Sequence, residues 1–434
     1  MAVRGHRRLG YPVAAGVFAV GMAGTTLPTP LYGLYREQLG FSELMVTVVF
    51  AVYALGVIAV LLLAGDLSDQ VGRRPVLLLA LGLSAASALC FLFEGGLPLL
   101  FTGRLLSGFA AGLLSGTATA CVLELAPPGR EARAGLAATA ANMGGLGCGP
   151  LLSGILAQYA PWPLALPFVT HLALVAVASV LTWFLPETVA SPHRPRLRPR
   201  GLSLPPGIRG VFVPSALAAF AGFALLGLFT AVAPSFVAQT LSVHNLAVTG
   251  AVVFSVFLAS TAGQALMGRL GVRAALPGGC LVLVAGLLLV AGSLAARSLP
   301  LLVAGALCGG LGQGLAFRAG MSAVSAVAPP EHRGATLSAF FVVAYTGISL
   351  PVVGVGALTL WLGLTGAGLT FSACVMVLAA CVGLYVLRHP PGVPGVSGFS
   401  GVPGASDASD VPDVPDVPDV PGVSGGEGTG DAGR

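Results

Sequence analysis

The chain is organised around long apolar segments that short polar segments separate. Each apolar segment has about 20 residues, enough for a helix to cross roughly 30 Å of hydrocarbon. Polar and apolar residues do not alternate within the segments, so we predict helices and not strands. Twelve spans are predicted, near residues 11–34, 44–64, 76–93, 98–123, 135–158, 163–185, 211–237, 246–267, 275–295, 299–327, 335–359 and 364–387.

The composition agrees with a chain that lies in a lipid bilayer. Of the 434 residues, 56% are hydrophobic and 9% are charged, and the mean hydropathy is +0.92. An ordinary soluble domain has about 25% charged residues. A chain this apolar cannot cover a water-facing surface of its own size, so we predict an all-α integral membrane protein with twelve transmembrane helices.

A polar segment rich in Pro and Arg, residues 187–210, divides the spans into six and six. We therefore predict an N-terminal half at residues 1–186 and a C-terminal half at residues 211–388. The halves resemble each other, because Ala-Pro-Pro at 126–128 recurs at 328–330, after the fourth span of each half. Residues 389–434 repeat Val-Pro-Asp, and this acidic composition predicts a disordered tail.

The distribution of Arg predicts the orientation in the membrane. With the N-terminus inside, the cytoplasmic segments hold sixteen Arg and the external loops two. Positive charge favours the cytoplasmic side, so both termini are predicted to be cytoplasmic in a cell membrane. All 21 basic residues are Arg, which is typical of GC-rich coding and favours a bacterial inner membrane. No basic stripe is interleaved with aromatic residues, so nucleic acid is not an expected partner.

The segment between the second and third predicted spans has an unusual concentration of charge. Residues 65–75 read Gly-Asp-Leu-Ser-Asp-Gln-Val-Gly-Arg-Arg-Pro, with Gly65, Asp69, Gly72, Arg73 and Arg74 in the order G-x-L-x-D-x-x-G-R-R. This pattern resembles the signature loop of major facilitator superfamily transporters, and further features resemble the drug and multidrug exporter branch. An ordinary cytoplasmic loop with positive charge is the alternative.

This resemblance implies a fold of two pseudo-symmetric six-helix halves and a secondary transporter that works by alternating access. It also assigns roles in gating or coupling to the five residues of the loop. We expect Asp69 and Arg73 to form part of a cytoplasmic latch that holds the outward-open state, because opposite charges attract more strongly where water is partly excluded.

Two further motifs lie in the fourth and fifth predicted spans. Arg104, between Leu100 and Gly108, resembles an Arg motif that is linked to proton movement in proton-coupled exporters. The alternative is an Arg side chain that extends to the lipid headgroups. Gly149 and Pro150 resemble a glycine-proline motif of antiporters, whose small residues allow close helix contact and whose proline bends the helix. Ordinary small-residue packing is the alternative there.

Polar side chains inside the spans are the candidates for a substrate cavity, which this fold places near the middle of the membrane. So few polar groups suit a lipophilic or amphipathic substrate better than a free sugar. Arg318 is the most interior charge and favours an anionic or zwitterionic amphiphile, or else bonds to helix carbonyls. The candidates are Thr25, Thr26, Tyr53, Asn142, Gln264, Gln313, Arg318 and Tyr345.

No carboxylate lies in the middle of a predicted span, which leaves the energy coupling open between proton antiport, exchange and facilitated flow. We expect an exporter of small organic, drug-like compounds. Uptake or exchange of a sugar or organic anion, or a sensor or scaffold without transport, remain the alternatives. HExxH, GxSxG and P-loop motifs are absent, so no enzyme is expected. We expect a monomer without metal or cofactor, with the substrate, the bilayer and candidate coupling protons as its partners.

Overall fold

The computed structural model describes residues 2–93, 95–189 and 205–389. This part of the chain is helical throughout, apart from short turns and connecting loops. Its elements are α1 (Ala2–Thr26), η1 (Thr29–Leu31), α2 (Tyr32–Leu39), α3 (Glu43–Leu63), α4 (Leu67–Val71), α5 (Arg73–Leu92), α6 (Leu97–Glu124), α7 (Glu131–Tyr159), α8 (Leu166–Trp183), η2 (Pro206–Ile208), α9 (Arg209–Gly227), η3 (Leu228–Val232), α10 (Ala233–Gln239), α11 (Leu246–Ala296), α12 (Leu299–Val327) and α13 (Arg333–Arg388).

Ten helical segments in the described residues are long and apolar enough to cross a membrane. Two of them, α11 with 51 residues and α13 with 56, are each broken at a glycine that leaves the helical conformation: Gly271 has φ 73° and Gly363 has φ 67°. At 1.5 Å per residue a helix of this length would span about twice the hydrocarbon core. Counted as two spans each, they give the twelve predicted helices.

Prolines interrupt the first span near Pro28 and Pro30. Helix α1 ends at Thr26, a 3₁₀ turn follows, and α2 continues the chain to Leu39. Proline has no backbone N–H and cannot continue the helical hydrogen bonding. The interruption leaves carbonyl groups near the end of α1 without helical partners, and one of them, that of Thr25, accepts a hydrogen bond from Arg104.

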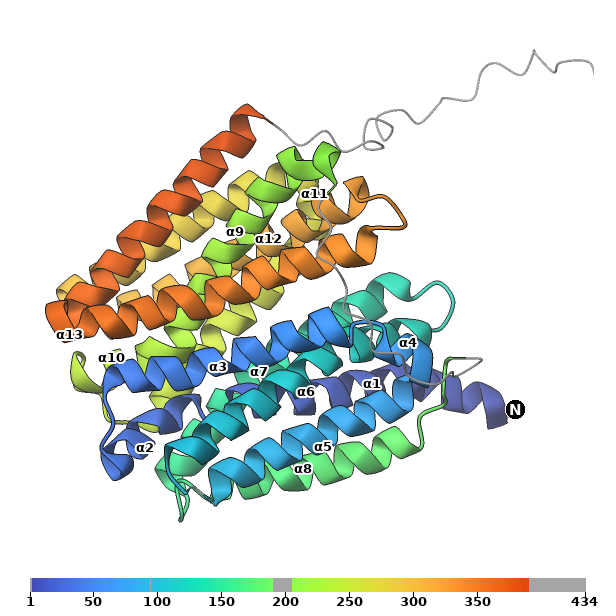
Figure 1. Cartoon of the computed structure of the whole chain (residues 1–434), viewed down its shortest axis with the longest axis horizontal. Coiled ribbons are helices and arrows are strands. Elements are labelled where there is room, and N and C mark those ends of the chain that lie inside the picture. The colour runs from blue at the N-terminus through green and yellow to red at the C-terminus, as the bar shows by residue number, and fades with distance from the viewer. Residues whose placement is uncertain (1, 94, 190–204, 390–434) are drawn as a thin grey trace, which may run out of the picture. The chain divides into compact units, whose positions relative to one another are not determined.

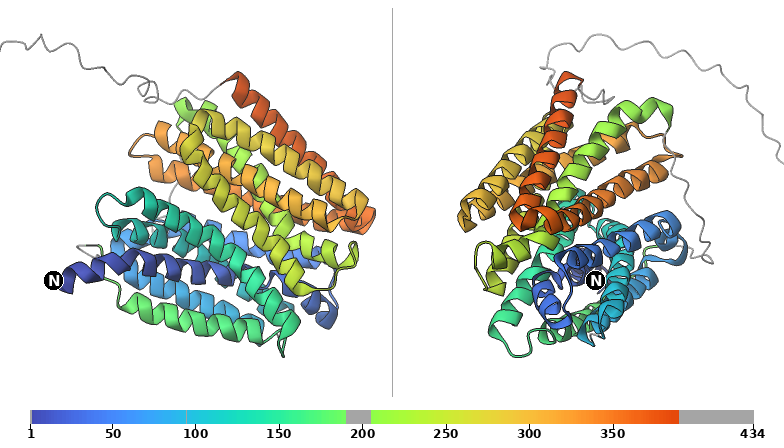
Figure 2. Two further views of the ribbon diagram at one scale, coloured as in Figure 1. Left: turned by 180° about the vertical axis from the view of Figure 1, so that it is seen from behind. Right: turned by 60° about the vertical axis from the view of Figure 1, so that its left-hand side comes forward.

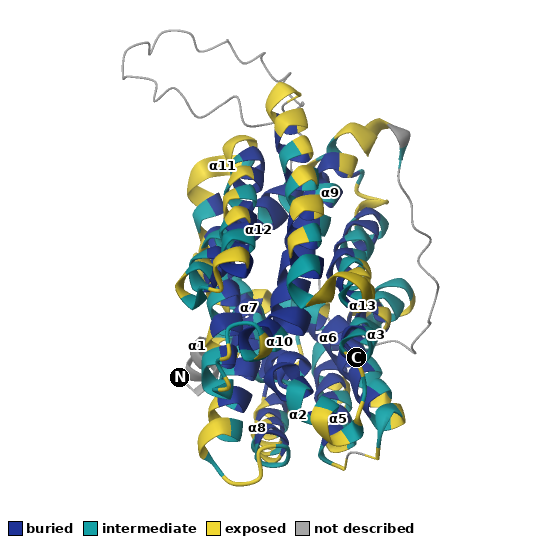
Figure 3. Ribbon diagram, turned by 90° about the vertical axis from the view of Figure 1, so that its left-hand side faces the viewer, coloured by how far each residue is buried: buried dark blue, intermediate teal, exposed yellow. Residues whose placement is uncertain are grey.

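The helices form two groups, which we call the N-terminal bundle (α1–α8) and the C-terminal bundle (α9–α13) (Figure 1). Helix α7 packs against α11, and α3 packs against α13, so each contact joins one bundle to the other. Figure 2 shows the first of these contacts from behind. Buried positions gather between the helices and exposed positions on their outer faces (Figure 3). Many large apolar side chains are exposed, Leu55, Trp183 and Trp361 among them, and such a surface suits contact with lipid.

The two ends of the bundles differ, and we name each by one residue. The Arg73 end carries α4, the first turn of α5 and the last turn of α6. The Glu43 end carries α2, the first turn of α3, and α10. In Figure 1 the bundles lie close together at the left, where α10 is next to α3, and they diverge toward α4.

The chain divides into two compact units, residues 1–393 and residues 394–434. Both predicted halves lie in the first unit, so their separation into domains stays a prediction. The predicted tail at 389–434 lies outside the described residues except for its first position, and residues 190–204 of the predicted linker also lie outside them.

Candidate functional site

A cavity of about 450 Å³ lies between the two bundles. It extends from Thr25 and Arg104 to Leu123 and Gly135, close to the Arg73 end. Leu123 is 42% exposed and is the last residue but one of α6, so the cavity opens toward this end. Six of the eight residues predicted to line a cavity do so: Thr25, Thr26, Tyr53, Asn142, Gln264 and Tyr345.

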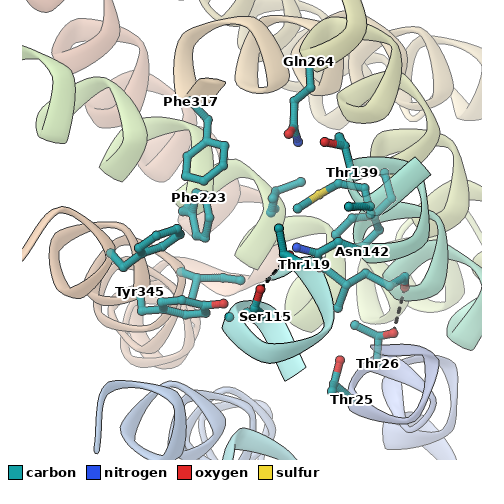
Figure 4. A pocket seen from close by; sticks show the side chains of 18 of the residues that line it. Thr25, Thr26, Ser115, Thr119, Thr139, Asn142, Phe223, Gln264, Phe317 and Tyr345 are labelled. Carbon is teal, nitrogen blue, oxygen red and sulfur yellow. Dashed lines mark hydrogen bonds between the residues drawn. The ribbon is translucent and has the colours of Figure 1, made fainter. Parts of the chain in front are cut away.

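The N-terminal bundle supplies most of the polar wall of the cavity (Figure 4). The hydroxyl of Thr119 donates to the backbone carbonyl of Ser115 at 2.7 Å. The hydroxyl of Ser115 donates to the backbone carbonyl of Ala111 at 2.8 Å. Thr26 donates to the Leu146 carbonyl at 2.7 Å, which ties α1 to α7. These hydroxyl protons are therefore donated to backbone carbonyls, and a hydroxyl oxygen can still accept a hydrogen bond after its proton is donated.

The C-terminal bundle supplies an aromatic wall. Phe223 packs on Phe317 with ring centroids 5.1 Å apart, and on Tyr345 at 5.6 Å. Tyr345 also meets Tyr53 of the other bundle edge to face, at 6.3 Å. Figure 4 shows Phe223, Phe317 and Tyr345 on the side of the cavity opposite Asn142. The two walls thus differ in chemistry, which suits an amphipathic ligand.

Arg104 turns into the bundle, and the alternative of a side chain at the headgroups is wrong. It is 1% exposed. Its guanidinium donates to the carbonyl of Thr25 at 2.6 Å and to that of Phe50 at 3.3 Å, and it lies 4.8 Å from the ring centre of Tyr53. The Nε–H is buried and has no partner in the described structure. Arg104 is thus a buried charge that joins α6 to α1 and α3.

Two of the predicted cavity residues lie beside the cavity and not in its wall. Gln313 is buried, and its side-chain oxygen accepts from Ser260 at 2.6 Å. Arg318 donates to the hydroxyl of Thr139 at 3.1 Å. Thr139 itself lines the cavity, so this bond places the Arg318 guanidinium at the cavity margin and links α12 to α7. Of the two alternatives for Arg318, bonds to helix carbonyls are not found in the described structure, and a role toward an anionic ligand stays a prediction.

The Glu43 end is closed by polar contacts between the bundles. The Glu43 carboxylate forms an ion pair with Arg36 and accepts from Ser235 at 2.8 Å and from Gln239 at 2.5 Å. Ser235 and Gln239 belong to α10, which follows the π-helical turn η3. One carboxylate at the start of α3 therefore holds the end of the C-terminal bundle.

Replacing Glu43 with alanine is expected to loosen this end, because two hydrogen bonds between the bundles and one ion pair are lost. Distances between spin labels on α2 and α10, measured by pulsed electron paramagnetic resonance in a cysteine-free background, should lengthen and broaden. Glu37→Ala is the matched control, because Glu37 is exposed at the same end. If the Glu43 variant kept the wild-type distances, the packing of α3 on α13 alone would hold this end closed.

Gly149 and Pro150 lie where three helices meet. A side chain at Gly149 would collide with the Ala23 carbonyl and the Thr26 hydroxyl of α1. The carbonyl of Pro150 lies against Gly250 of α11, which has no side chain to keep it away. The predicted close contact is therefore present, and it involves both α1 and the other bundle.

Arg73 is the centre of a charged network at the Arg73 end. Its guanidinium pairs with Asp69 at 2.5 Å, as the sequence predicts, and with both carboxylate oxygens of Glu124, at 2.8 and 3.2 Å. It also donates to the Ser68 hydroxyl at 2.6 Å. The Arg73 side chain is 12% exposed, whereas Asp69 is 57% exposed. Glu124 is 36% exposed, so it is the more shielded of the two acidic partners of Arg73.

A second carboxylate caps the helix that Arg73 begins. Glu187 accepts hydrogen bonds from the backbone N–H groups of Arg73, at 2.8 Å, and Arg74, at 3.0 Å. Negative charge is favourable at a helix N-terminus. Gly72 allows this approach, because it has φ 114° and any side chain there would meet the Glu187 carboxylate. The Arg74 guanidinium stacks on Trp183 at 4.3 Å, and Gly65 lies in the turn before α4.

Sequence reasoning missed several of these residues. Glu124 and Glu187 were visible as acids near the same predicted membrane surface as Arg73, but nothing in the sequence paired them with it. Ser115, Thr119 and Thr139 were overlooked as cavity residues, because serine and threonine are common in transmembrane helices and often bond only to their own backbone.

Comparison with protein families identifies the class. Residues 13–270, more than half of the chain, match the family model of the Major Facilitator Superfamily. The chain therefore belongs to this superfamily of membrane transporters. Its membrane-spanning helices, the loop from Gly65 to Arg74 and the cavity between two bundles agree with the resemblance found in the sequence.

Similarity to individual proteins is more distant. Tetracycline resistance protein, class B, of Escherichia coli is 31% identical over 170 residues, which are 38% of this chain and 40% of that protein. The putative multidrug resistance protein MdtD of Salmonella typhimurium is 29% identical over 150 residues, which are 35% of this chain and 32% of that protein. The matches thus span less than half of these relatives.

Solved structures share the fold over most of the chain. The crystal structure of the human organic anion transporter MFSD10 (TETRAN) has a TM-score of 0.62 at 19% identity, over 87% of this chain and 99% of that one. A bacterial homolog of the human lysosomal transporter Spinster, in an inward-facing and unoccupied conformation, has a TM-score of 0.64 at 14% identity, over 88% and 96%. At these identities the likeness shows the fold.

Proposed function

We propose that this protein is a secondary active exporter of small organic, drug-like compounds, and that it works as a monomer by alternating access. The observation that carries the proposal is the cavity between the bundles, which opens at the Arg73 end while Glu43 closes the other end. Tetracycline and multidrug resistance proteins among the relatives support export of drug-like compounds.

The Arg73 end is proposed to be cytoplasmic, as the excess of Arg in that set of loops favours. On that assignment the described state is inward-facing, and both termini lie in the cytoplasm of a bacterial cell. In this state Asp69 is exposed and bound to Arg73. We propose that it forms its latch with the C-terminal bundle when the Arg73 end closes.

Protons are the proposed coupling ion, although the cavity wall has no carboxylate among the described residues. Glu124 and Asp69, at the mouth, are the candidate groups for proton exchange. Facilitated exchange of an organic anion is the second candidate function, because the one charged residue in the described cavity wall is Arg104.

Accumulation assays test the proposal. Cells that express the gene should accumulate less of some compound in a lipophilic panel than cells with an empty vector, and an uncoupler should abolish the difference. A difference that survives the uncoupler would favour exchange or facilitated flow. Equal accumulation of the whole panel, with the protein present in the membrane and also inactive in proteoliposomes, would contradict a transport function.

A further inference from the structure

The cavity has a positive charge that no carboxylate in the described part of the chain neutralises. Arg104 is charged, is buried in the cavity wall, and donates only to backbone carbonyls. Every described Asp and Glu lies in a loop or in a terminal turn of a helix. Carbonyl dipoles offset part of a guanidinium charge, but an ionised side chain inside a membrane normally has a partner of opposite charge.

A second guanidinium lies at the margin of the same cavity. Arg318 of the C-terminal bundle donates to the hydroxyl of Thr139, a neutral group that lines the cavity. No ion pair of Arg318 is found within the described residues. Arg104 and Arg318 thus place one unneutralised positive charge in each bundle, with the cavity beside both.

The positive charge of Arg104 acts on the cavity through space. Arg104 is 1% exposed and lies against the rings of Phe50 and Tyr53, at 5.1 and 4.8 Å, and both rings line the cavity. In surroundings of low dielectric constant the interaction of two charges is several times stronger than in water. A ligand in the cavity therefore senses this charge even where it does not contact the guanidinium directly.

The aromatic wall adds a requirement on the shape of the ligand. Phe223, Phe317 and Tyr345 form a continuous cluster, with neighbouring ring centroids 5.1 and 5.6 Å apart. Such a surface favours flat aromatic groups, which stack or pack edge to face on it. The hydroxyl groups of Ser115 and Thr119 in the other wall donate their protons to backbone carbonyls, so toward a ligand they can act as acceptors.

We propose that the cavity selects organic anions with a flat aromatic body. The body packs on Phe223, Phe317 and Tyr345, and the anionic group is held in the positive field of Arg104 and Arg318. This inference rests on the proposed transport function and specifies its substrate class. The cavity volume of about 450 Å³ limits the ligand to a molecule of drug-like size.

A series of three probes with one ring system tests the charge preference. Naphthoate is anionic, naphthamide is neutral and naphthylmethylammonium is cationic at neutral pH. Binding to the full-length protein is measured by isothermal titration calorimetry in nanodiscs of phosphatidylcholine, whose zwitterionic headgroups do not sort the probes by charge. Naphthoate should bind about tenfold more tightly than naphthamide, and the cation should bind most weakly.

Variants assign the preference to the two guanidinium groups. Arg104→Gln and Arg318→Gln should each lower the ratio of naphthoate to naphthamide affinity by about threefold, because the two groups share the tenfold preference, whereas Arg104→Lys should keep it near the wild-type value. Arg133→Gln is the matched control, because Arg133 is exposed at the Arg73 end, and it should not change the ratio. The test on the wild-type protein stands even if one variant fails to fold.

Equal affinity for the three probes, tighter binding of the cation, or no binding of any probe would overturn the inference. The accumulation assays described above remain independent of this result. If cells export neutral or cationic compounds while naphthoate does not bind, the anion preference is wrong and the transport function stands. If naphthoate binds as expected but no compound is transported, the binding preference holds and the transport function fails.

Discussion

Gly149→Ala is expected to reduce both the thermal stability and the transport rate of the protein. The new methyl group would meet the Ala23 carbonyl and the Thr26 hydroxyl, the latter 2.7 Å away, where α1 crosses α7. Overpacking of this kind costs about 1–3 kcal/mol. The same contact has to change when the bundles move, because Pro150, the next residue, lies against α11 of the other bundle.

Gly144 provides a matched control in the same helix. A methyl group there meets no atom within 4 Å, so Gly144→Ala should leave transport unchanged and stabilise the helix slightly, by less than about 1 kcal/mol. Thermal unfolding followed by size-exclusion chromatography, together with uptake into inverted vesicles, measures both effects. Equal behaviour of the two variants would show that α1 can move away from α7 at no cost.

Arg73→Gln is expected to reduce transport by about tenfold or more while the protein stays inserted. The substitution removes the ion pairs with Glu124 and Asp69 and leaves Glu124 beside the capped start of α5. Hydrogen bonds to charged groups contribute about 1.5–3 kcal/mol, and 1.4 kcal/mol corresponds to a factor of ten. Glu124 is 36% exposed, so solvent screens its charge, and we expect the lost interaction to be near the lower end of this energy range, which corresponds to a loss of about tenfold.

A double-mutant cycle separates the pair from its surroundings. Glu124→Gln alone should also reduce transport, and the double variant should lose less than the sum of the two single losses, because each substitution breaks the same contact. Arg130→Gln controls for the removal of an exposed Arg near the same surface. Additive losses in the cycle would mean that Arg73 and Glu124 act separately, and the network would then be a structural coincidence.

The sequence predicted the spans and the signature loop because both depend on short stretches of chain. An apolar run of sufficient length has to be helical in a bilayer, whatever its neighbours are. Asp69 and Arg73 are only four residues apart, on either side of the turn at Gly72, so their pairing needs no distant segment of the chain. The interruption after Thr26 follows from Pro28 and Pro30 in the same way, because proline removes backbone donors.

The partners of these residues could not be predicted, because they are distant along the chain. Glu124 lies 51 positions from Arg73, and Glu187 lies 114 positions from it. Likewise, the Arg104 guanidinium bonds to a carbonyl 79 positions away, and Arg318 to a hydroxyl 179 positions away. The sequence indicated that each charge needs a partner, but several acids and many carbonyls were available.

The sequence by itself therefore determined the class of fold, the apolar spans and the charged loop at the Arg73 end. Tertiary structure alone decided which polar groups face the cavity. Gln313 and Arg318 lie on one helix and were expected in the cavity wall, but Gln313 bonds to Ser260 and Arg318 reaches Thr139 at the margin. The physical reason is that the lipid and the interior of a helix bundle are both apolar. The pattern of apolar residues therefore hardly shows which face of a membrane helix points to lipid and which points to other helices.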